Sequence, residues 1–486
     1  MKLLYILFIF SSALFLNACD QSSSFYPTDP ATAAPDNGSS TPDFTGEVPG
    51  PGSGDETPLS ITSLPDDLSR GLAFLPETHT ISTEGGSGGN SFSVSLDAAG
   101  GINAAIDEFG ELTLSGVEGV ISNTTVTVTV EDSDGTTANA QFNVDVAPYS
   151  AQGAMVLDQE WTQSDGSGND LTRHYDYYVP SGYSSPMPLV LVLHGAFGNK
   201  NEQHEILEPE AGFYVDPPTR RWLQIADEQG VIVAFPNGLG IGDDDTETST
   251  LFWNDCRGDQ LRSRDDLAFI DALPSEINAL TSGKIDSANL FVMGISNGGM
   301  MSYRIAREST LDWNAIAATV ANEPQSASGS EPCATPTANQ APSMLMLFST
   351  ADTIMPYAGG NPGIALLEAM IEESGGTPPP PSFYPLVLGS VVSGDDTISQ
   401  WQTILGTGTS ATTTGHTDLV LDDGSTATTY SYSNSTTGKA LEVIRVDGGK
   451  HNLPSREFIT PDDYRDQNND IEAIDHIWHF FQSHSN

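Results

Sequence analysis

The chain has 486 residues, 38% of them hydrophobic, which is enough for two or three globular domains. Its 65 acidic and 17 basic residues give a formal net charge of -48, with the acidic residues spread along the chain. A field of this sign repels phosphate backbones and anionic lipid surfaces, so the composition argues against nucleic acid as a partner and indicates a soluble surface.

Residues 1–18 have the pattern of a bacterial export signal. Lys2 precedes an apolar run that is too short to span a membrane, and small residues follow it. The sequence LNAC, which ends at Cys19, resembles the lipobox of bacterial lipoproteins. This resemblance implies that Cys19 becomes the lipidated first residue and anchors the protein by acyl chains at the cell envelope or cell surface. The alternative is an ordinary secretory signal with a chance cysteine.

The next two segments differ in composition and in hydrophobic pattern. Residues 19–58 are rich in Ser, Thr, Pro, Gly and Asp, which predicts a disordered tether. Residues 59–148 contain short alternating runs, and TTVTVTVEDSDGTTANAQFNVDVA predicts a β-hairpin with a DSDG turn. This segment resembles the cadherin-like and immunoglobulin-like β-sandwiches of bacterial surface proteins. Glu131, Asp132 and Asp134 form either an acidic turn, which we favour, or a calcium site.

From residue 150 to residue 486 the pattern becomes alternating strand and helix. Continuous apolar strands separated by helices are typical of a mostly parallel sheet covered on both faces, which is an α/β fold. The sequences DDLAFIDALPSEINALT, MMSYRIARE and DIEAIDHIWHFF predict helices, whereas 378–381 and 406–427 are expected to be inserted loops. The predicted strands are Leu189–Leu193, Val231–Phe235, Leu290–Met293, Met344–Phe348 and Val443–Val446.

The sequence FVMGISNGGMMSYRIA carries the strongest catalytic signal. Gly294, Ser296 and Gly298 fit G-x-S-x-G, with a predicted strand before the motif and a predicted helix after it. This context is that of a nucleophile elbow, a tight turn that presents a serine hydroxyl above the edge of the sheet. Because glycine permits close backbone approach, the motif favours a nucleophile at Ser296 over a simple helix cap.

A serine nucleophile needs a base, and the base needs an orienting acid. Asp352 follows one predicted strand and His451 follows another, so both are expected at the carboxyl edge of the sheet near Ser296. Asp447 is the rival acid, but it is too near His451 in sequence to support it from another strand end. His416 lies in a polar loop and is expected at the surface.

The oxyanion that forms in acyl transfer needs two preorganised N–H donors. We expect one from the backbone of Asn297, directly after the nucleophile, and the other from Ala196 in the loop that follows LVLVLHG. His194 is expected to brace that loop rather than act as the base. His194, Phe197 and Trp401 are candidates for the substrate pocket.

The ordered motifs resemble one enzyme family. HGAFGN, VIVAFPNG, DDLAFI, KIDSANLFVMGISNGGMMSYRIA, STADTIMPYAGG, ISQWQ and GGKHNLP are similar, in this order, to the secreted polyhydroxybutyrate depolymerase-like and feruloyl esterase-like α/β hydrolases. The resemblance covers residues 165–486 and implies the α/β-hydrolase fold. It implies that Ser296 is the nucleophile, Asp352 the acid and His451 the base, with Trp401 on a helix between the last two.

The departures from the family pattern concern the substrate side. The acid motif, usually H-G-T-x-D, reads FSTAD and ends at Asp352. Lys450 precedes the histidine and Leu453 follows it, where relatives often have a third glycine and a tryptophan, and Leu405-Gly406 lacks the usual following cysteine. These changes leave the triad intact, but they leave undetermined which acyl and alcohol groups the substrate carries.

Two cysteines remain after Cys19. Cys256 and Cys333 are expected to pair as a disulfide in an oxidising compartment, and they match positions that often carry cysteines in the family. Two free thiols are the alternative.

The motif set predicts a lipid-anchored serine carboxylic ester hydrolase that needs no cofactor or metal. The resemblance favours a polyester depolymerase of polyhydroxyalkanoate type, and the alternative is a feruloyl or acetyl esterase on polysaccharides. A non-catalytic polymer-binding surface lipoprotein is the candidate from a different class. The expected partners are an ester substrate, either a polymer or a small molecule, and a membrane reached through the anchor; the oligomeric state is not predicted.

Overall fold

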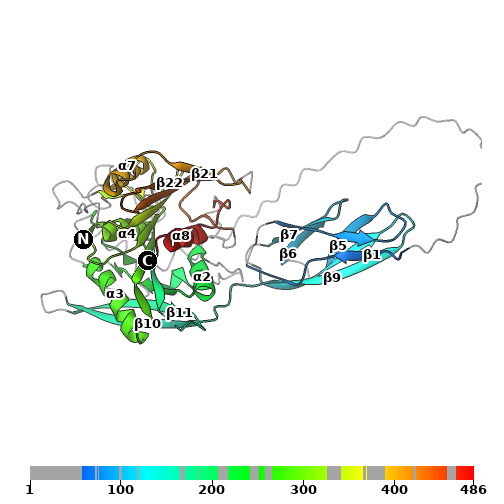
Figure 1. Cartoon of the computed structure of the whole chain (residues 1–486), viewed down its shortest axis with the longest axis horizontal. Helices are drawn as coiled ribbons and strands as arrows, with labels where there is room; N and C mark the ends of the chain where they lie inside the picture. Colours follow the sequence, from blue (N-terminus) through cyan, green and yellow to red (C-terminus); the bar gives the residue numbers. More distant parts are fainter. Residues whose placement is uncertain are drawn as a thin grey trace, which may run out of the picture.

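The computed structural model describes residues 57–71, 74, 76–97, 101–117, 120–164, 170–184, 186–205, 217–240, 251–257, 265–325, 341–364, 368, 389–419, 423–456 and 467–486. The predicted signal peptide, Cys19 and almost the whole predicted tether lie outside these residues. Figure 1 shows two folded units, an all-β unit before residue 150 and a larger α/β unit after it.

The all-β unit contains a four-stranded sheet, in the order β2-β9-β8-β5, and a three-stranded sheet, in the order β3-β7-β6. The predicted hairpin is present, because β8 and β9 pair antiparallel from Ser122↔Val146 to Glu131↔Thr137. Alternate residues of these strands are buried in one apolar cluster with Leu112 and Leu114. The resemblance to cadherin-like and immunoglobulin-like domains stays a prediction. A short pair, β1 (Ser60–Ser63) with β4 (Ser82–Glu84), lies outside these two sheets. The other strands of this unit in the described residues are β2 (Leu68–Arg70), β3 (Glu77–Thr80), β5 (Ser91–Leu96), β6 (Ile102–Ile106), β7 (Glu111–Gly116), β8 (Ser122–Glu131) and β9 (Thr137–Val146).

The acidic hairpin turn has its carboxylate engaged by the backbone. The Asp132 carboxylate accepts hydrogen bonds from the amides of Ser87, Asp134 and Thr136 at 3.0, 3.0 and 2.8 Å. These bonds lower the pKa of Asp132. Within the described residues, no group of three or more His, Cys, Asp or Glu side chains could hold a metal ion. These contacts favour the acidic-turn interpretation over a calcium site.

The α/β unit is built on a ten-stranded mixed sheet in the order β10-β11-β13-β12-β16-β17-β19-β23-β22-β21. The strands from β13 to β23 in this order run parallel, and the strands at both edges are antiparallel. The strands are β10 (Ala154–Ser164), β11 (Asp170–Val179), β12 (Met187–Leu193), β13 (Ile232–Pro236), β16 (Ile285–Ile295), β17 (Ala315–Thr319), β19 (Ser343–Ser349), β21 (Thr412–Gly415), β22 (Thr426–Ser433) and β23 (Ala440–Asp447). Two short pairs lie outside this sheet, β14 (Leu239–Gly240) with β15 (Leu251–Phe252) and β18 (Pro324–Gln325) with β20 (Ser390–Val391).

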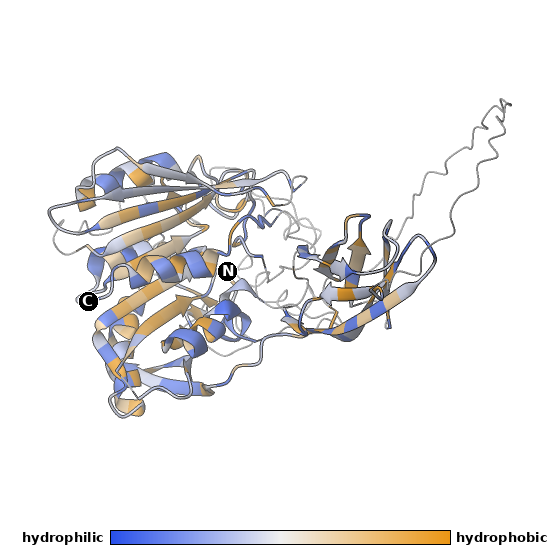
Figure 2. Ribbon diagram, turned by 45° about the vertical axis from the view of Figure 1, so that its right-hand side comes forward, coloured by the Kyte–Doolittle hydropathy of each residue, from blue (hydrophilic) through white to orange (hydrophobic). Residues whose placement is uncertain are grey.

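Helices cover both faces of this sheet, so each central strand is buried on both sides. In β12, Leu189, Leu191 and Leu193 contribute to one core, whereas Val190 and Val192 contribute to the other. The first core also contains side chains of α3 (Asp266–Leu280), α4 (Asn297–Glu308) and α7 (Gly394–Leu405), and the second contains those of α2 (Arg221–Gln229) and α8 (Ala473–Gln482). Figure 2 shows the apolar strands between these helices. This arrangement agrees with the predicted α/β-hydrolase architecture.

One predicted loop region is wrong in part. The segment 406–427 contains β21, which pairs with β22 and forms an edge of the large sheet. Its Thr- and Gly-rich composition hid a strand because an exposed edge strand needs few apolar residues. The predicted loop 378–381 lies outside the described residues, as does much of the stretch 360–400.

Candidate active site

Ser296 occupies a strained turn between β16 and α4. Its φ of 54° and ψ of -114° lie outside the regions that ordinary residues prefer. The three surrounding glycines are required because neighbouring atoms leave no room for a side chain. A Cβ on Gly294 would lie 2.1 Å from the Gly298 oxygen, and a Cβ on Gly298 would lie 2.5 Å from the oxygens of Leu193 and His194. A Cβ on Gly299 would lie 2.6 Å from the Cβ of Ala321. The predicted strand–serine–helix elbow is therefore present.

The two other residues of the predicted triad are in direct contact. Nδ1 of His451 lies 2.6 Å from Oδ2 of Asp352. The other carboxylate oxygen of Asp352 accepts the amides of Ile354 and Met355 at 2.8 and 2.7 Å. The Asp352 side chain is buried and that of His451 is 15% exposed, so the acid is enclosed and the imidazole is reachable. A buried carboxylate with these donors can hold Nδ1 protonated and leave Nε2 as the base.

Backbone contacts hold the acid loop and the histidine loop together. The amides of Thr350 and Ala351 donate to the oxygens of Val446 and Gly449, both at 3.0 Å. The amide of Gly448 returns a bond to Oγ1 of Thr350 at 2.9 Å. The His451–Asp352 pair is thus carried by two loops that hydrogen bonds join to each other.

The sheet brings Ser296 to the same edge as this pair. Strands β16, β17, β19 and β23 are parallel neighbours, so their carboxyl ends lie together. The register aligns Ile295 with Thr319 and Thr319 with Leu347, and the Ser296 amide donates to the Thr319 oxygen at 2.9 Å. The three predicted triad residues therefore follow three strands at one edge, as expected.

The rival residues lie elsewhere. Asp447 is 44% exposed and pairs with Arg445 at 3.0 Å, so the acid that contacts His451 is Asp352. His416 is half-buried rather than fully at the surface, because Nε2 lies 2.8 Å from Oγ1 of Thr429.

The predicted oxyanion loop, residues 194–200, lies against the nucleophile. A Cβ on Gly195 would lie 3.5 Å from the Cβ of Ser296. The amide of Phe197 is engaged by the Leu251 oxygen at 3.0 Å, which leaves Ala196 as the better donor candidate in this loop. The amide of Asn297 belongs to the first turn of α4, where N–H groups have no acceptor within the helix. Asn297 directly follows Ser296, and Ala196 follows Gly195, which lies against it; the catalytic role of both predicted donors stays a proposal.

His194 braces this loop. Its Nε2 accepts the amide of Gly238 at 2.9 Å, so Nδ1 carries the hydrogen and donates to the Gly195 oxygen at 2.7 Å. Burial lowers the pKa of His194 to about 4, which keeps the ring neutral. The bracing role fits, but the pocket role needs correction, because a fully buried ring cannot contact a substrate that arrives from solvent.

A second support for the loop was not predicted from the sequence. Oδ1 of Asn297 accepts the Trp253 amide at 2.7 Å, and its Nδ2 donates to Oδ2 of Asp255 at 2.6 Å. Nε1 of Trp253 donates to the His194 oxygen at 3.0 Å. The segment 251–257 therefore connects both candidate oxyanion segments. In the sequence, the only indication of this support was the polar and aromatic cluster FWND.

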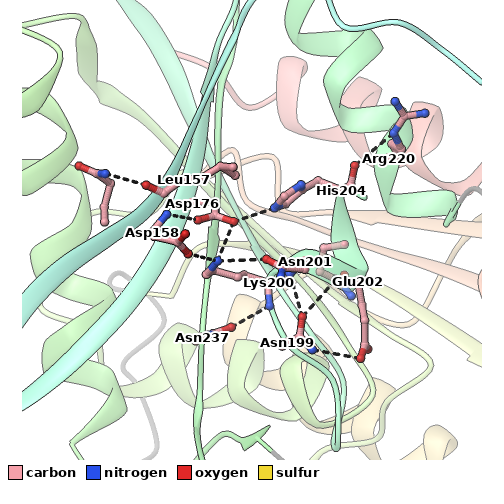
Figure 3. Close-up of polar contacts among 12 residues, drawn as sticks. Leu157, Asp158, Asp176, Asn199, Lys200, Asn201, Glu202, His204, Arg220 and Asn237 are labelled. Atoms are coloured by element: carbon pink, nitrogen blue, oxygen red, sulfur yellow. Dashed lines mark hydrogen bonds and ion pairs between the residues drawn. The ribbon is translucent and has the colours of Figure 1, made fainter. Parts of the chain in front are cut away.

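A buried ionic network anchors the far end of the loop (Figure 3). Nζ of Lys200 lies 3.0 Å from Asp176 and 2.7 Å from Asp158, and Nε2 of His204 lies 2.9 Å from Asp176. The side chains of Lys200 and Asp176 are almost fully buried. The amide of Lys200 also donates to Oδ1 of Asn237 at 2.7 Å. These contacts join the loop to β10, β11 and the end of β13.

The other two pocket candidates differ in exposure. Trp401 is fully buried on α7, where Nε1 donates to Oε2 of Glu323 at 2.6 Å and Arg307 lies over the ring at 5.5 Å. The prediction of a pocket residue is wrong here, because this ring packs in the core. Phe197 is 39% exposed and contacts the ring of Phe252 edge-on at 4.8 Å, so it presents an apolar surface beside the oxyanion loop.

Cys256 is buried beside this site in the segment 251–257. Cys333, its predicted partner, lies outside the described residues, so the disulfide stays a prediction.

Known proteins similar to this chain are esterases and related hydrolases. No family model matches the chain. The chain is 28% identical over 195 residues to "Putative esterase NocK" of Nocardia uniformis subsp. tsuyamanensis; the match covers 39% of this chain and 47% of that protein, about half its length.

Solved structures resemble the chain distantly. The dienelactone hydrolase-like promiscuous phosphotriesterase P91 from metagenomic libraries is 12% identical, with a TM-score of 0.33, over 69% of this chain and 100% of that one. A ferulic acid esterase is 14% identical, with a TM-score of 0.25, over 35% and 61% of the two chains. The Bacillus cereus carboxylesterase is 16% identical, with a TM-score of 0.26, over 42% and 82%. Likenesses of this size carry no functional argument, so the function is argued from the site.

Proposed function

We propose that this protein is a serine carboxylic ester hydrolase that works through an acyl-enzyme. The observations that carry the proposal are the elbow at Ser296 and the His451–Asp352 pair, which follow parallel strands at one edge of the sheet. A strained serine would be costly without a use for its hydroxyl. The competing role, a non-catalytic polymer-binding lipoprotein, predicts a missing triad member, and all three are present.

The proposed reaction has two halves. Nε2 of His451 takes the proton of Ser296 as the hydroxyl oxygen attacks the ester carbonyl, and Asp352 stabilises the imidazolium. The amides of Asn297 and Ala196 bind the oxyanion. The tetrahedral intermediate collapses, and the alcohol leaves with the proton from His451. Water, deprotonated by His451, then attacks the acyl-enzyme and releases the acid and Ser296.

The finer substrate assignment rests on the family resemblance. It favours a polyester of the polyhydroxyalkanoate type, and the exposed ring of Phe197 offers an apolar contact for an acyl chain near the oxyanion loop. A feruloyl or acetyl ester on a polysaccharide is the second candidate, because an exposed aromatic pair such as Phe197 and Phe252 also suits an aromatic acyl group.

We also propose that the protein is held at the bacterial cell envelope or surface by lipid on Cys19. The support is the signal-like start and the LNAC sequence. In the part of the chain that the structure describes, no helix has the length and apolar character needed to span a bilayer. Radiolabelled palmitate incorporation that depends on Cys19 tests the anchor, and unlabelled protein from cells that label other lipoproteins would refute it.

Substitution of the nucleophile tests the chemistry. Ser296→Ala should lower kcat on a short-chain nitrophenyl ester by about a million-fold while leaving the fold intact by circular dichroism. Ser435→Ala, at an exposed turn, is the matched control and should keep full activity. Retention of a tenth of the activity by Ser296→Ala would refute the assignment. Methyl ferulate and a film of polyhydroxybutyrate, given to the wild-type protein, separate the two substrate classes.

A further inference from the structure

A solvent-open pocket of about 260 Å³ lies between α7 and the outer strands β22 and β23. None of the residues of the proposed triad lines it. Its walls combine aromatic rings with charged and amide groups, chiefly Tyr357, Tyr430, Tyr432, Asp395, Gln402 and Arg445. We name it the tyrosine pocket.

The fold holds the three tyrosines in place. Tyr430 and Tyr432 are alternate residues of β22, so they project on the same face of the sheet, and they pair with Val443 and Leu441 of β23. Both rings pack against the core cluster beneath α7. The Tyr357 ring contacts Phe348 edge-on, with 5.7 Å between the ring centroids. The rings are half-buried, so each keeps some surface for a ligand while its orientation is fixed.

The polar groups are also prepositioned. The hydroxyl of Tyr357 donates to Oδ1 of Asp395 at 2.6 Å. The guanidinium of Arg445 lies over the Tyr430 ring at 5.4 Å and pairs with Asp447 at 3.0 Å. Burial raises the pKa of Tyr357, so its phenol stays neutral and keeps this hydrogen bond to Asp395. The pocket therefore offers both hydrogen-bond donors and acceptors beside apolar ring surface.

This chemistry discriminates between ligand classes. The carboxylates of Asp395 and Asp447 outnumber the charge of Arg445, so an anionic ligand is disfavoured. A polyester chain has no hydrogen-bond donors, and it would desolvate the Asp395 carboxylate without replacing the lost water. A neutral sugar ring supplies hydroxyl donors and acceptors at its rim and C–H groups on its faces. It is the ligand class that satisfies both the rings and the polar groups.

The pocket adjoins the loops of the candidate active site. Tyr357 lies in the loop that carries Asp352 after β19, and Arg445 is near the end of β23, just before the loop that carries His451. Backbone bonds connect these two loops. The tyrosine pocket is therefore lined in part by the strand and the loop that lead to the proposed base and acid.

We propose that the tyrosine pocket binds a neutral saccharide unit of a polysaccharide. Binding there does not require the serine chemistry, so it can be tested on a protein that cannot turn over esters. If the proposed esterase activity failed, this inference would still stand or fall on its own measurement.

The test is isothermal titration calorimetry of the full chain carrying Ser296→Ala with xylohexaose, cellohexaose and laminarihexaose. At least one hexasaccharide should bind, and Tyr432→Ala should weaken binding about tenfold through lost ring contact. Gln402→Ala, a milder change on α7, should weaken it about fivefold through a lost hydrogen bond. Phe109→Ala, which removes a 75% exposed ring of the all-β unit, is the control and should leave binding unchanged.

Two results would overturn the proposal. One is an absence of heat with all three hexasaccharides at about 10 mM, a concentration well above the Kd of a useful subsite. The other is binding that Phe109→Ala abolishes and the two pocket variants leave intact, which would assign the saccharide to the all-β unit.

Discussion

The close approach of the elbow to the oxyanion loop makes Gly298→Ala a sharp test of the site. An added Cβ would lie 2.5 Å from the carbonyl oxygens of Leu193 and His194, which are backbone atoms and cannot rotate away. An ordinary C···O contact is about 3.3 Å or longer, so the two segments must separate by about 0.8 Å. Overpacking of this kind costs about 1–3 kcal/mol of stability.

The same displacement should affect catalysis. Gly298 directly follows Asn297, and His194 is close in sequence to Ala196, so separation of the two segments moves the two proposed oxyanion donors apart. A misplacement of about 1 Å can cost a hundred-fold in rate, and we expect a loss of kcat of that order with a smaller change in KM. The assay is nitrophenyl ester hydrolysis, with urea denaturation to measure the free energy of unfolding.

Gly195→Ala is the matched control for stability. A Cβ at Gly195 would make an ordinary contact of 3.5 Å with the Ser296 Cβ, so its free energy of unfolding should stay within about 0.5 kcal/mol of wild type. Gly298→Ala that is as stable as Gly195→Ala and keeps more than half of the wild-type kcat would contradict the expected clash.

Three further changes test other parts of the site. Asp352→Asn should keep the fold and lower kcat about ten-thousand-fold, because the amide favours the wrong tautomer of His451; a loss below tenfold would argue against the pair. Burial raises the pKa of Glu202 from 4.5 to about 7. Between pH 4.5 and about pH 7 the folded protein therefore keeps the Glu202 carboxyl protonated while the unfolded chain loses this proton, and the free energy of unfolding falls as pH rises through this range. Glu202→Gln has no such titration, so the stability of the variant relative to wild type, measured by urea denaturation, should be greater at pH 8 than at pH 4. The same difference between variant and wild type at both pH values would contradict the expectation. Lys200→Met leaves the buried Asp176 charge without its lysine and should cost about 3–5 kcal/mol in thermal unfolding, whereas Lys200→Met with Asp176→Asn should recover part of it.

The central strands were predictable because burial on both faces produces continuous apolar runs. The five predicted runs lie within or overlap β12, β13, β16, β19 and β23. Strand β17 was missed because its sequence AIAAT is short and alanine-rich, which suits a helix as well as a strand. Strands β10 and β11 were missed because both carry polar and charged residues that break the apolar pattern, and β10 is a half-exposed edge strand.

Local motifs predicted the chemical groups of the site but not the contacts that hold them. The elbow, Asp352 and His451 each follow an apolar strand, so strand order alone brought them to one edge. Trp401 was misplaced because the pattern shows that a helix carries it and not which face it occupies. The pairing of Lys200 with Asp176 joins residues from different strands and loops, and no local pattern records such a contact.

The contacts of Trp253 explain why the sheet alone does not determine the oxyanion geometry. The two proposed donors belong to segments that follow β12 and β16, and neighbouring strands set their separation only approximately. The Trp253 amide binds the side chain of Asn297, and its indole binds the oxygen of His194, so one residue fixes both segments. His194 in turn holds the Gly238 amide, which closes the support around the loop. Donors for a developing charge must be in place before the reaction, and the segment 251–257 supports both proposed donor segments through these hydrogen bonds.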